Sequence, residues 1–205
     1  MPQLPTDTAM HIKEQKDLLR SRFRAIRRSL PAEERSALDG ALCRGILRLP
    51  QFQDALVILG FFPVRDEPDL RPLYEEALAL GKTVAFPICH KENHTMRFRA
   101  VRDLSELTVG SYGIPEPSED CEDVSHSNSA LCVVPALSAT RDGTRLGYGG
   151  GYYDRFLASF CGYTVCPLYS MLLTDSLPVD GFDVAVDQII TELGGITPNG
   201  KKSKL

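Results

Sequence analysis

ALVILGFFPVRDEPDLRPLYEEALALGKTVAFPI, residues 55–88, is the stretch that decides the fold. Its first nine residues form a short apolar run, which is typical of a strand buried on both faces. The segment DLRPLYEEALAL, residues 69–80, predicts a helix that Gly81 closes at its C′ position. TVAFPI, residues 83–88, predicts a second strand. A strand, a helix and a strand at this spacing form a βαβ unit, which implies a parallel sheet.

Two helices are predicted before this unit. Apolar side chains recur every three or four residues over 12–30, which indicates an amphipathic helix. A second helix follows Pro31, a residue suited to a first helical turn, and we expect Pro50 to end it. Glu33 and Glu34 favour this helix start because they lie near its positive end.

The rest of the chain continues the alternation of strands and helices. We expect 96–101 to be a strand that pairs through a turn at 91–94, and 110–129, rich in Pro, Gly, Ser and acidic residues, to be a surface loop. Further strands are predicted within 130–137, 163–169 and 182–191, with a helix over 151–160. The result is an α/β fold: a mostly parallel sheet with helices on both faces, in one three-layer domain. That domain spans 1–205, with its core at about 12–192 and a loose tail at 193–205.

The composition is that of a soluble globular protein. Of the 205 residues 43% are hydrophobic and 24% charged, and the net charge of -4 gives no general attraction for nucleic acid or anionic membranes. The six cysteines contain no C-x-x-C pair, so we expect reduced thiols and a cytoplasmic protein. The ending Ser203-Lys204-Leu205 spells a peroxisomal address, which would matter only in a eukaryotic source.

A glycine-rich stretch, Gly147-Tyr148-Gly149-Gly150-Gly151, precedes the helix predicted over 151–160. We call it the glycine loop. Glycines let a phosphate chain lie against the main chain without meeting a Cβ atom. Arg145 can neutralise a transferring phosphoryl group, and Asp154 is placed to hold Mg²⁺. The alternative is a flexible loop whose glycines serve only turns.

The first predicted helix carries a basic face. Lys16, Arg20, Arg24 and Arg27 are spaced four, four and three residues apart, so their like charges repel one another. A bound polyanion would remove that penalty. The alternative is an ordinary solvated face.

An aromatic and acidic corner follows the first buried strand. Phe61 and Phe62 precede Asp66 and Glu67, a combination suited to a flat heterocycle that donates hydrogen bonds. The alternative is a pair of core phenylalanines followed by a polar loop. Because no serine or cysteine has an evident histidine partner, the sequence predicts a magnesium–nucleotide enzyme with a second, organic substrate and leaves the reaction open.

These segments resemble the 5-formyltetrahydrofolate cyclo-ligase family, also called methenyltetrahydrofolate synthetases. The resemblance is carried by GTRLGYGGGYYDRFL (143–157), KDLLR (16–20), PAEER (31–35), GKTVAFP (81–87), YGIPEP (112–117) and VVPAL (133–137). It implies that ATP phosphorylates the formyl oxygen of 5-formyltetrahydrofolate. A neighbouring nitrogen of the folate then attacks the formyl carbon, and loss of phosphate gives 5,10-methenyltetrahydrofolate, ADP and phosphate.

The resemblance also implies roles for individual residues. Catalytic roles fall to Arg145 and Lys16, folate contacts to Phe62, Glu67 and Tyr153, and Mg²⁺ binding to Asp154 and Asp183. The nucleotide would be held by Lys16, Arg20, Arg145, Leu146, Gly147, Tyr148, Gly149, Gly150, Gly151, Tyr152 and Tyr153.

Two other functions stay open at the level of sequence. One is a different ATP-dependent enzyme on the same scaffold that acts on another pterin or a small carboxylate. The other is a non-catalytic nucleotide- or RNA-binding module that uses the basic helix, although the acidic net charge argues against RNA. We expect no nucleic-acid or membrane partner, and a monomer or weak dimer.

Overall fold

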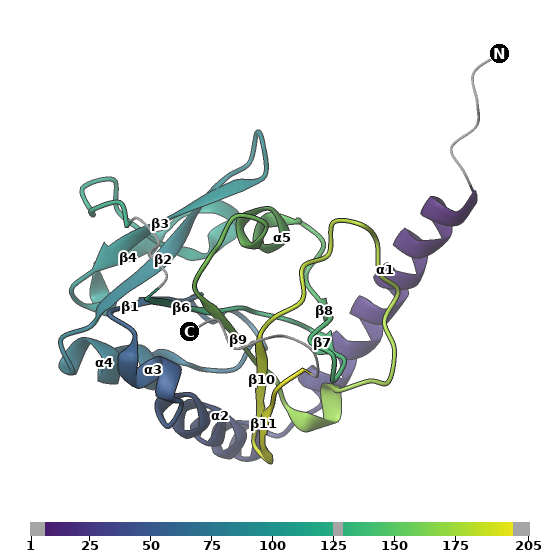
Figure 1. Ribbon diagram of the computed structural model, residues 1–205, viewed down its shortest axis with the longest axis horizontal. Coiled ribbons are helices and arrows are strands. Elements are labelled where there is room, and N and C mark those ends of the chain that lie inside the picture. Colours follow the sequence, from purple (N-terminus) through teal and green to yellow (C-terminus); the bar gives the residue numbers. More distant parts are fainter. Residues whose placement is uncertain (1–6, 125–128, 199–205) are drawn as a thin grey trace.

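A computed structural model describes residues 7–124 and 129–198, and its centre is a seven-stranded sheet (Figure 1). The strand order is β11-β10-β9-β6-β1-β2-β3. The five central strands run parallel, whereas β11 pairs with β10 and β3 pairs with β2 in antiparallel register. The bounds are β1 Val57–Leu59, β2 Thr83–His90, β3 Thr95–Val101, β6 Ala130–Val133, β9 Tyr163–Pro167, β10 Gln188–Thr191 and β11 Gly194–Ile196.

Helices cover both faces of this sheet. In Figure 1, α2, α3 and α4 lie below the strands and α5 lies above them, so the predicted three-layer α/β arrangement is confirmed. The α-helices are α1 Asp7–Arg28, α2 Ala32–Leu47, α3 Pro50–Asp54, α4 Arg71–Ala79 and α5 Tyr152–Leu157. The described residues also form short 3₁₀ helices: η1 Leu104–Glu106, η2 Ser111–Gly113 and η3 Ser170–Leu172.

Two small hairpin sheets accompany the main sheet. β4, Leu107–Val109, pairs with β5, Pro115–Pro117. β7, Ser138–Ala139, pairs with β8, Arg145–Leu146, directly before the glycine loop. The second hairpin therefore fixes where that loop begins.

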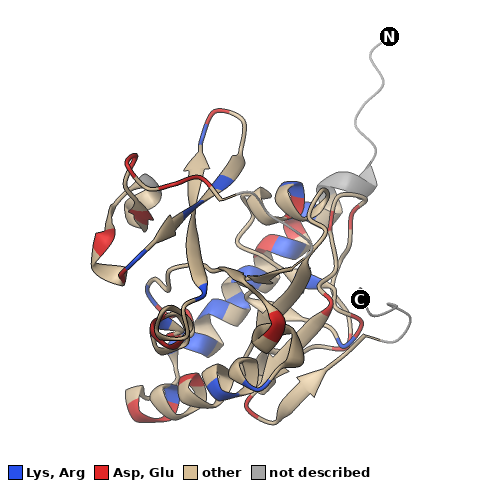
Figure 2. Ribbon diagram, turned by 60° about the vertical axis from the view of Figure 1, so that its left-hand side comes forward, with Lys and Arg blue, Asp and Glu red and all other residues tan. Residues whose placement is uncertain are grey.

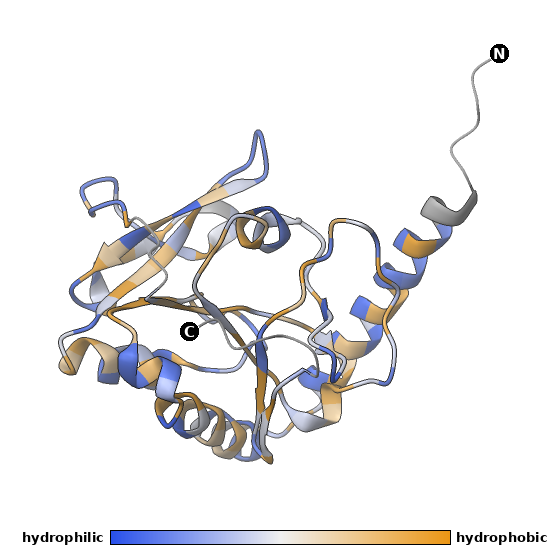
Figure 3. Ribbon diagram, in the orientation of Figure 1, coloured by the Kyte–Doolittle hydropathy of each residue, from blue (hydrophilic) through white to orange (hydrophobic). Residues whose placement is uncertain are grey.

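The core lies between the sheet and the helices. Figure 3 shows that the central strands are mainly apolar, as expected for strands with layers on both sides. Ile58 of β1, Leu131 of β6, Val165 of β9 and Ile189 of β10 are fully buried. Within the described residues, no helix is both long and apolar enough to cross a lipid bilayer.

The amino-terminal predictions are largely confirmed. The β1–α4–β2 unit occupies residues 57–90, and the turn at 91–94 joins β2 to β3 as predicted. Pro50 does not end the second helix, because α2 stops at Leu47 and Pro50 begins α3 as its first residue. Proline is well placed there, since its missing N–H would lack a partner in any first turn.

Four expectations in the second half of the chain are wrong in part. The segment 110–129 contains β5, and Glu116 of that strand is buried. The last helix ends at Leu157, and only Gln188–Thr191 of the predicted final strand is a strand. The tail is not loose from residue 193, because Gly194–Ile196 pairs with β10. The tripeptide 203–205 lies outside the described residues.

The strand order also locates a crevice. The chain passes from β1 to β2 on one side, and later returns to place β6 on the other side of β1. The loops leaving β1 and β6 therefore diverge at the carboxyl ends of these strands, where ligands bind in open α/β sheets. The aromatic–acid corner follows β1, and the β7–β8 hairpin and glycine loop follow β6.

Candidate active site

A buried arginine joins the segments around this crevice. The side chain of Arg27 on α1 is 1% exposed. Its Nε donates to Asp66 Oδ2 over 2.9 Å, its Nη2 to the Tyr148 hydroxyl over 2.6 Å and its Nη1 to the Ala136 carbonyl over 3.3 Å. These partners belong to the loop after β1, the glycine loop and the loop after β6. Arg27 thus holds three loops at one place.

The pairing of Arg27 with Asp66 settles the role of one acidic residue of the corner. Burial alone would raise the pKa of Asp66, but the hydrogen bond and charge of Arg27 outweigh it and the pKa is lowered. Phe61 is also buried. Phe61 and Asp66 are therefore structural, in line with the alternative reading of the corner, whereas Phe62 and Glu67 are more open.

Glu67 links the corner to the glycine loop. Its Oε2 accepts a hydrogen bond from the Val64 amide over 3.0 Å, and its carboxylate interacts electrostatically with the nearby Tyr148 hydroxyl. Burial raises the pKa of Glu67, because desolvation disfavours the charged form. The predicted folate contact thus lies close to the predicted nucleotide loop.

The glycine loop lies against α1. Gly149 has φ +102° and Gly151 has φ +70°, values that L side chains rarely adopt. A Cβ atom at Gly149 would lie 3.2 Å from Cζ of Arg20. The Nε atom of Arg20 donates to the Gly147 carbonyl over 2.9 Å. Glycine at 149 therefore serves both the turn and the close approach of Arg20.

The basic face of α1 is not solvated along its whole length. Figure 2 shows basic residues recurring along α1, yet Lys16 and Arg27 are buried. Lys16 Nζ donates to Asp180 Oδ2 over 2.8 Å and to Asp183 Oδ2 over 2.6 Å. The structure thus pairs a predicted nucleotide contact, Lys16, with a predicted metal ligand, Asp183. Asp180, in the same LPVDGFD segment, was missed by the sequence reasoning.

Arg145 and Asp154 form a second ion pair beside the loop. Arg145 is buried in β8, and its Nη2 donates to Asp154 Oδ1 over 2.9 Å. The same oxygen accepts a bond from the Val184 amide over 3.3 Å, next to Asp183. Leu146 points into the core, being 2% exposed, so only its backbone is available to a nucleotide.

Two buried polar atoms in this region have no hydrogen-bond partner among the described residues: the Tyr153 hydroxyl and Arg145 Nε. Such atoms are rare, and leaving one unpaired costs roughly 1–3 kcal/mol. Burial raises the pKa of Tyr153 well above its ordinary value, so the hydroxyl stays protonated and able to donate. A bound ligand would supply the missing partner.

Tyr152 is oriented toward the β2–β3 hairpin. Its hydroxyl lies 2.8 Å from that of Tyr112, and its ring centroid lies 5.5 Å from that of His94. Its predicted contact with the nucleotide remains a prediction. These contacts show that Tyr152 joins α5 to the hairpin tip and to η2.

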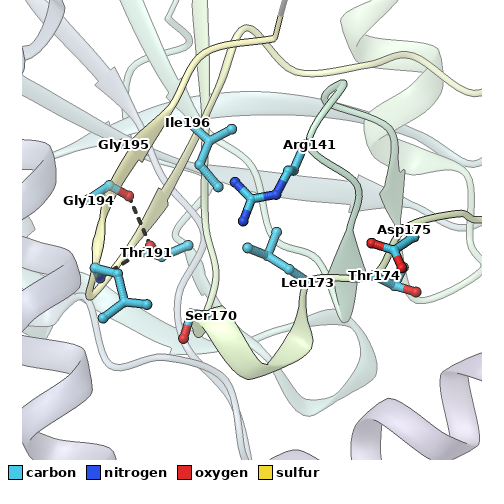
Figure 4. Close-up of a pocket in the computed structure, with 10 residues that line it drawn as sticks. Arg141, Ser170, Leu173, Thr174, Asp175, Thr191, Gly194, Gly195 and Ile196 are labelled. Atoms are coloured by element: carbon cyan, nitrogen blue, oxygen red, sulfur yellow. Dashed lines mark hydrogen bonds between the residues drawn. The ribbon is translucent and has the colours of Figure 1, made fainter.

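The described residues enclose, among others, two cavities of about 540 Å³. One lies between α2 and the loop after β1, and Phe62 and Glu67 are among the residues that line it. The other lies near β11 and η3, where Arg141 extends between Ile196 and Leu173 (Figure 4). No residue of the predicted site lines this second cavity, so the first is the candidate substrate cavity.

The predicted metal ligands suit Mg²⁺ in type. Mg²⁺ is usually held by one or two carboxylates together with substrate phosphates and water. Asp154 and Asp183 supply two carboxylates, which Arg145 and Lys16 neutralise in this structure. No group of three or more metal-binding side chains occurs in the part of the chain that the structure describes, so phosphate oxygens would have to complete the shell.

Known proteins resemble the chain over most of its length. A 5-formyltetrahydrofolate cyclo-ligase from Mycolicibacterium smegmatis is 30% identical over 190 residues, which cover 88% of this chain and 95% of the relative. The Escherichia coli K12 cyclo-ligase is 28% identical over 174 residues, covering 82% and 96%. The solved structure of Aquifex aeolicus 5,10-methenyltetrahydrofolate synthetase matches with a TM-score of 0.80 at 31% identity, covering 92% of this chain and 95% of that one.

The family's sequence profile matches residues 12–192, a range that includes both loops of the crevice, the ion pairs of Lys16 and Arg145, and the hydrogen bonds of Arg27. This chain therefore belongs to the 5-formyltetrahydrofolate cyclo-ligase family.

Proposed function

We propose that this protein converts 5-formyltetrahydrofolate to 5,10-methenyltetrahydrofolate, using ATP and Mg²⁺ and releasing ADP and phosphate. The formyl oxygen attacks the γ-phosphorus of ATP and the bond to ADP breaks, which leaves a phosphorylated formyl group. A neighbouring folate nitrogen then attacks the formyl carbon, and the carbon–oxygen bond breaks to release phosphate. This route needs no protein nucleophile, so positioning and charge neutralisation carry the catalysis.

One observation carries the proposal: Arg27 donates hydrogen bonds both to Asp66, next to Glu67, and to Tyr148 of the glycine loop. Glu67 belongs to the corner suited to a heterocycle, and Tyr148 belongs to the glycine loop suited to phosphates. Because one side chain bonds to both loops, a pterin beside Glu67 and a nucleotide along the glycine loop would lie next to each other. Direct transfer of a phosphoryl group requires that proximity.

The residues divide into a folate side and a nucleotide side. Phe62 packs edge-on against Phe86 at 6.1 Å between ring centroids, which leaves its ring fixed beside the candidate cavity. Glu67 would accept hydrogen bonds from the pterin, and the unpaired Tyr153 hydroxyl would donate one to the substrate. Such fixed groups favour one orientation of the formyl group.

On the nucleotide side, the glycine loop, Lys16 and Arg20 would bind the phosphates. Arg145 would stabilise charge on the transferring phosphoryl group with its free Nε donor. Asp154 and Asp183 would hold Mg²⁺, which would neutralise negative charge on the phosphates. Binding the cation and the phosphates would require Lys16 and Arg145 to exchange carboxylate partners for phosphate partners.

A direct assay tests the proposal. Purified protein is mixed with 5-formyltetrahydrofolate and magnesium–ATP, and the near-ultraviolet absorbance of the methenyl product is followed. We expect a rise that stops when ATP is omitted or when Mg²⁺ is chelated, with one ADP formed per product. A flat trace from folded protein that still binds ATP would overturn the folate reaction and leave the nucleotide site in place.

A further inference from the structure

Phe182 is an aromatic residue to which the proposed reaction gives no role. It is 86% exposed, whereas the other phenylalanines of the chain are buried or, like Phe62, half-buried. Among the described residues, no aromatic ring or cation packs against Phe182. The ring is therefore open to a flat ligand, for which stacking on an aromatic face is favourable.

A short turn holds this residue in place. The Asp183 amide donates to the Asp180 carbonyl over 3.2 Å, which closes the turn around Gly181 and Phe182. The Phe182 amide donates to Asp180 Oδ1 over 3.0 Å, and the Asp180 amide donates to Asp183 Oδ2 over 2.9 Å. These bonds lie within the turn, so the backbone of Phe182 is fixed without any contact from its ring.

The turn is attached to the nucleotide side of the site. Figure 1 shows the segment that carries it running beside α1. Lys16 of α1 donates to Asp180 over 2.8 Å and to Asp183 over 2.6 Å. Lys16 is one of the residues that we expect to bind the phosphates of ATP. Because Phe182 lies between the two carboxylates in the sequence, its ring is close to a proposed phosphate contact.

The contacts along α1 give the nucleotide a direction. Arg27 bonds to both loops at the folate end, and Arg20, seven residues earlier, bonds to the Gly147 carbonyl of the glycine loop. Lys16 lies four residues earlier again. At a rise of about 1.5 Å per residue, Arg27 and Lys16 are roughly 16 Å apart along the helix axis. The γ-phosphate must lie beside the folate, so the nucleoside end of ATP lies toward Lys16 and the turn that carries Phe182.

We propose that the adenine base of ATP stacks on Phe182. The inference rests on the proposed function, because the position of the folate sets the direction of ATP. Phosphate contacts hold a nucleotide and an inorganic polyphosphate alike, whereas a stacked base is a contact that only the nucleotide makes. Stacking of a base on an aromatic side chain typically strengthens binding by about tenfold or more.

A fluorescent variant tests the contact directly. The chain has no tryptophan, so Phe182→Trp introduces the only one. Magnesium–ATP should quench the emission of this variant, with a dissociation constant within about twofold of the wild-type value, because an indole ring also stacks on a base. Tripolyphosphate should bind without quenching. Leu193→Trp is the matched control: Leu193 is 82% exposed between β10 and β11, and ATP should leave the emission of that variant unchanged.

A truncation separates the base from the phosphates. Phe182→Ala should raise the dissociation constant of magnesium–ATP by about tenfold and change that of tripolyphosphate by less than about twofold, both measured by calorimetric titration. Val179→Ala is the matched control, because Val179 is 50% exposed in the same loop, and it should change neither constant. The unfolding temperature of each variant shows whether it is folded.

Two results would overturn the contact. One is ATP binding without quenching in Phe182→Trp, and the other is an equal loss of affinity for ATP and tripolyphosphate in Phe182→Ala, which would mean that the turn only positions Lys16. Neither titration contains folate, so the contact is tested apart from the reaction. Quenching by ATP in a protein that forms no methenyl product would overturn the folate reaction and leave the stacking in place. Wild-type protein that binds no ATP would overturn both.

Discussion

The Nη2 atom of Arg27 donates a 2.6 Å hydrogen bond to the hydroxyl of Tyr148, and its Nε atom donates a 2.9 Å bond to Asp66. A residue of α1 thus reaches both the glycine loop and the loop after β1. A guanidinium this deeply buried is stable only while its partners are present. The contact makes the amino-terminal helix part of the site rather than a covering element.

Replacing Arg27 by Met should destabilise the fold. The change leaves the carboxylate of Asp66 without its buried partner, and breaking such a pair costs about 3–5 kcal/mol. The free energy of unfolding, measured in urea, is expected to fall by this amount. Arg28→Met is the matched control, because Arg28 is 61% exposed and lies 3.7 Å from the same carboxylate. It should change stability by no more than about 0.5 kcal/mol, and equal losses in both variants would refute the role of Arg27.

The sequence predicted the centre of the fold because its signals there are local. The apolar run of β1, the helix closed by Gly81 and the strand β2 follow one another with regular spacing. β11 was missed because Gly194-Gly195-Ile196 has no alternating pattern, and it is a strand only through its pairing with β10. β5 was missed because Pro115-Glu116-Pro117 is typical of a loop.

The sequence was enough to predict which residues belong to the site, but not which residues they pair with. Lys16 and Arg27 share one helical face in the sequence, and nothing local shows that one pairs with Asp183 and the other with Asp66. These partners are more than thirty residues away along the chain, and the strand order brings them together. Ion pairs between residues far apart in the sequence determine which charged side chains support the fold and which are left able to bind a ligand.

Gly149→Ala should weaken ATP binding strongly and lower the stability of the fold only moderately. At φ +102° an added Cβ is strained, and it would also lie 3.2 Å from Cζ of Arg20. We expect a loss of about 1–2 kcal/mol in unfolding free energy and a loss of at least about tenfold in ATP affinity. Gly194→Ala tests strain alone, because φ is +129° and nothing lies within 4 Å of the added Cβ. Equal ATP affinity in the two variants would exclude the glycine loop as the phosphate site.

Glu67→Gln should make stability less dependent on pH. Burial raises the pKa of Glu67 above its ordinary value of 4.5, so the folded protein binds this proton more tightly than the unfolded chain does. The wild type therefore loses stability, relative to the Gln variant, as pH rises from that value through the raised pKa. Urea unfolding at acidic and at neutral pH measures the difference. Glu76→Gln, at an exposed position on α4, should follow the wild type at every pH.

The same substitution should affect the binding of the two substrates differently. Glu67→Gln should raise the KM for 5-formyltetrahydrofolate by roughly tenfold, since a charge-assisted acceptor for the pterin is lost. The dissociation constant of ATP should stay within about twofold, because the glycine loop keeps its hydroxyl contact with Arg27. Equal losses for both ligands would mean that Glu67 supports the fold of both loops rather than binding the pterin.

Asp154→Asn should raise the Mg²⁺ concentration needed for half-maximal activity by about tenfold or more, because a neutral amide is a weaker ligand than a carboxylate for a hard cation. ATP binding without Mg²⁺ should not weaken, since the change removes a negative charge near the phosphates and frees Arg145 to contact them. Asp175→Asn, at the cavity near β11, is the control and should leave the titration unchanged. If the Mg²⁺ titrations of the two variants superimpose, Asp154 serves only to hold Arg145, and the cation must be bound by other groups.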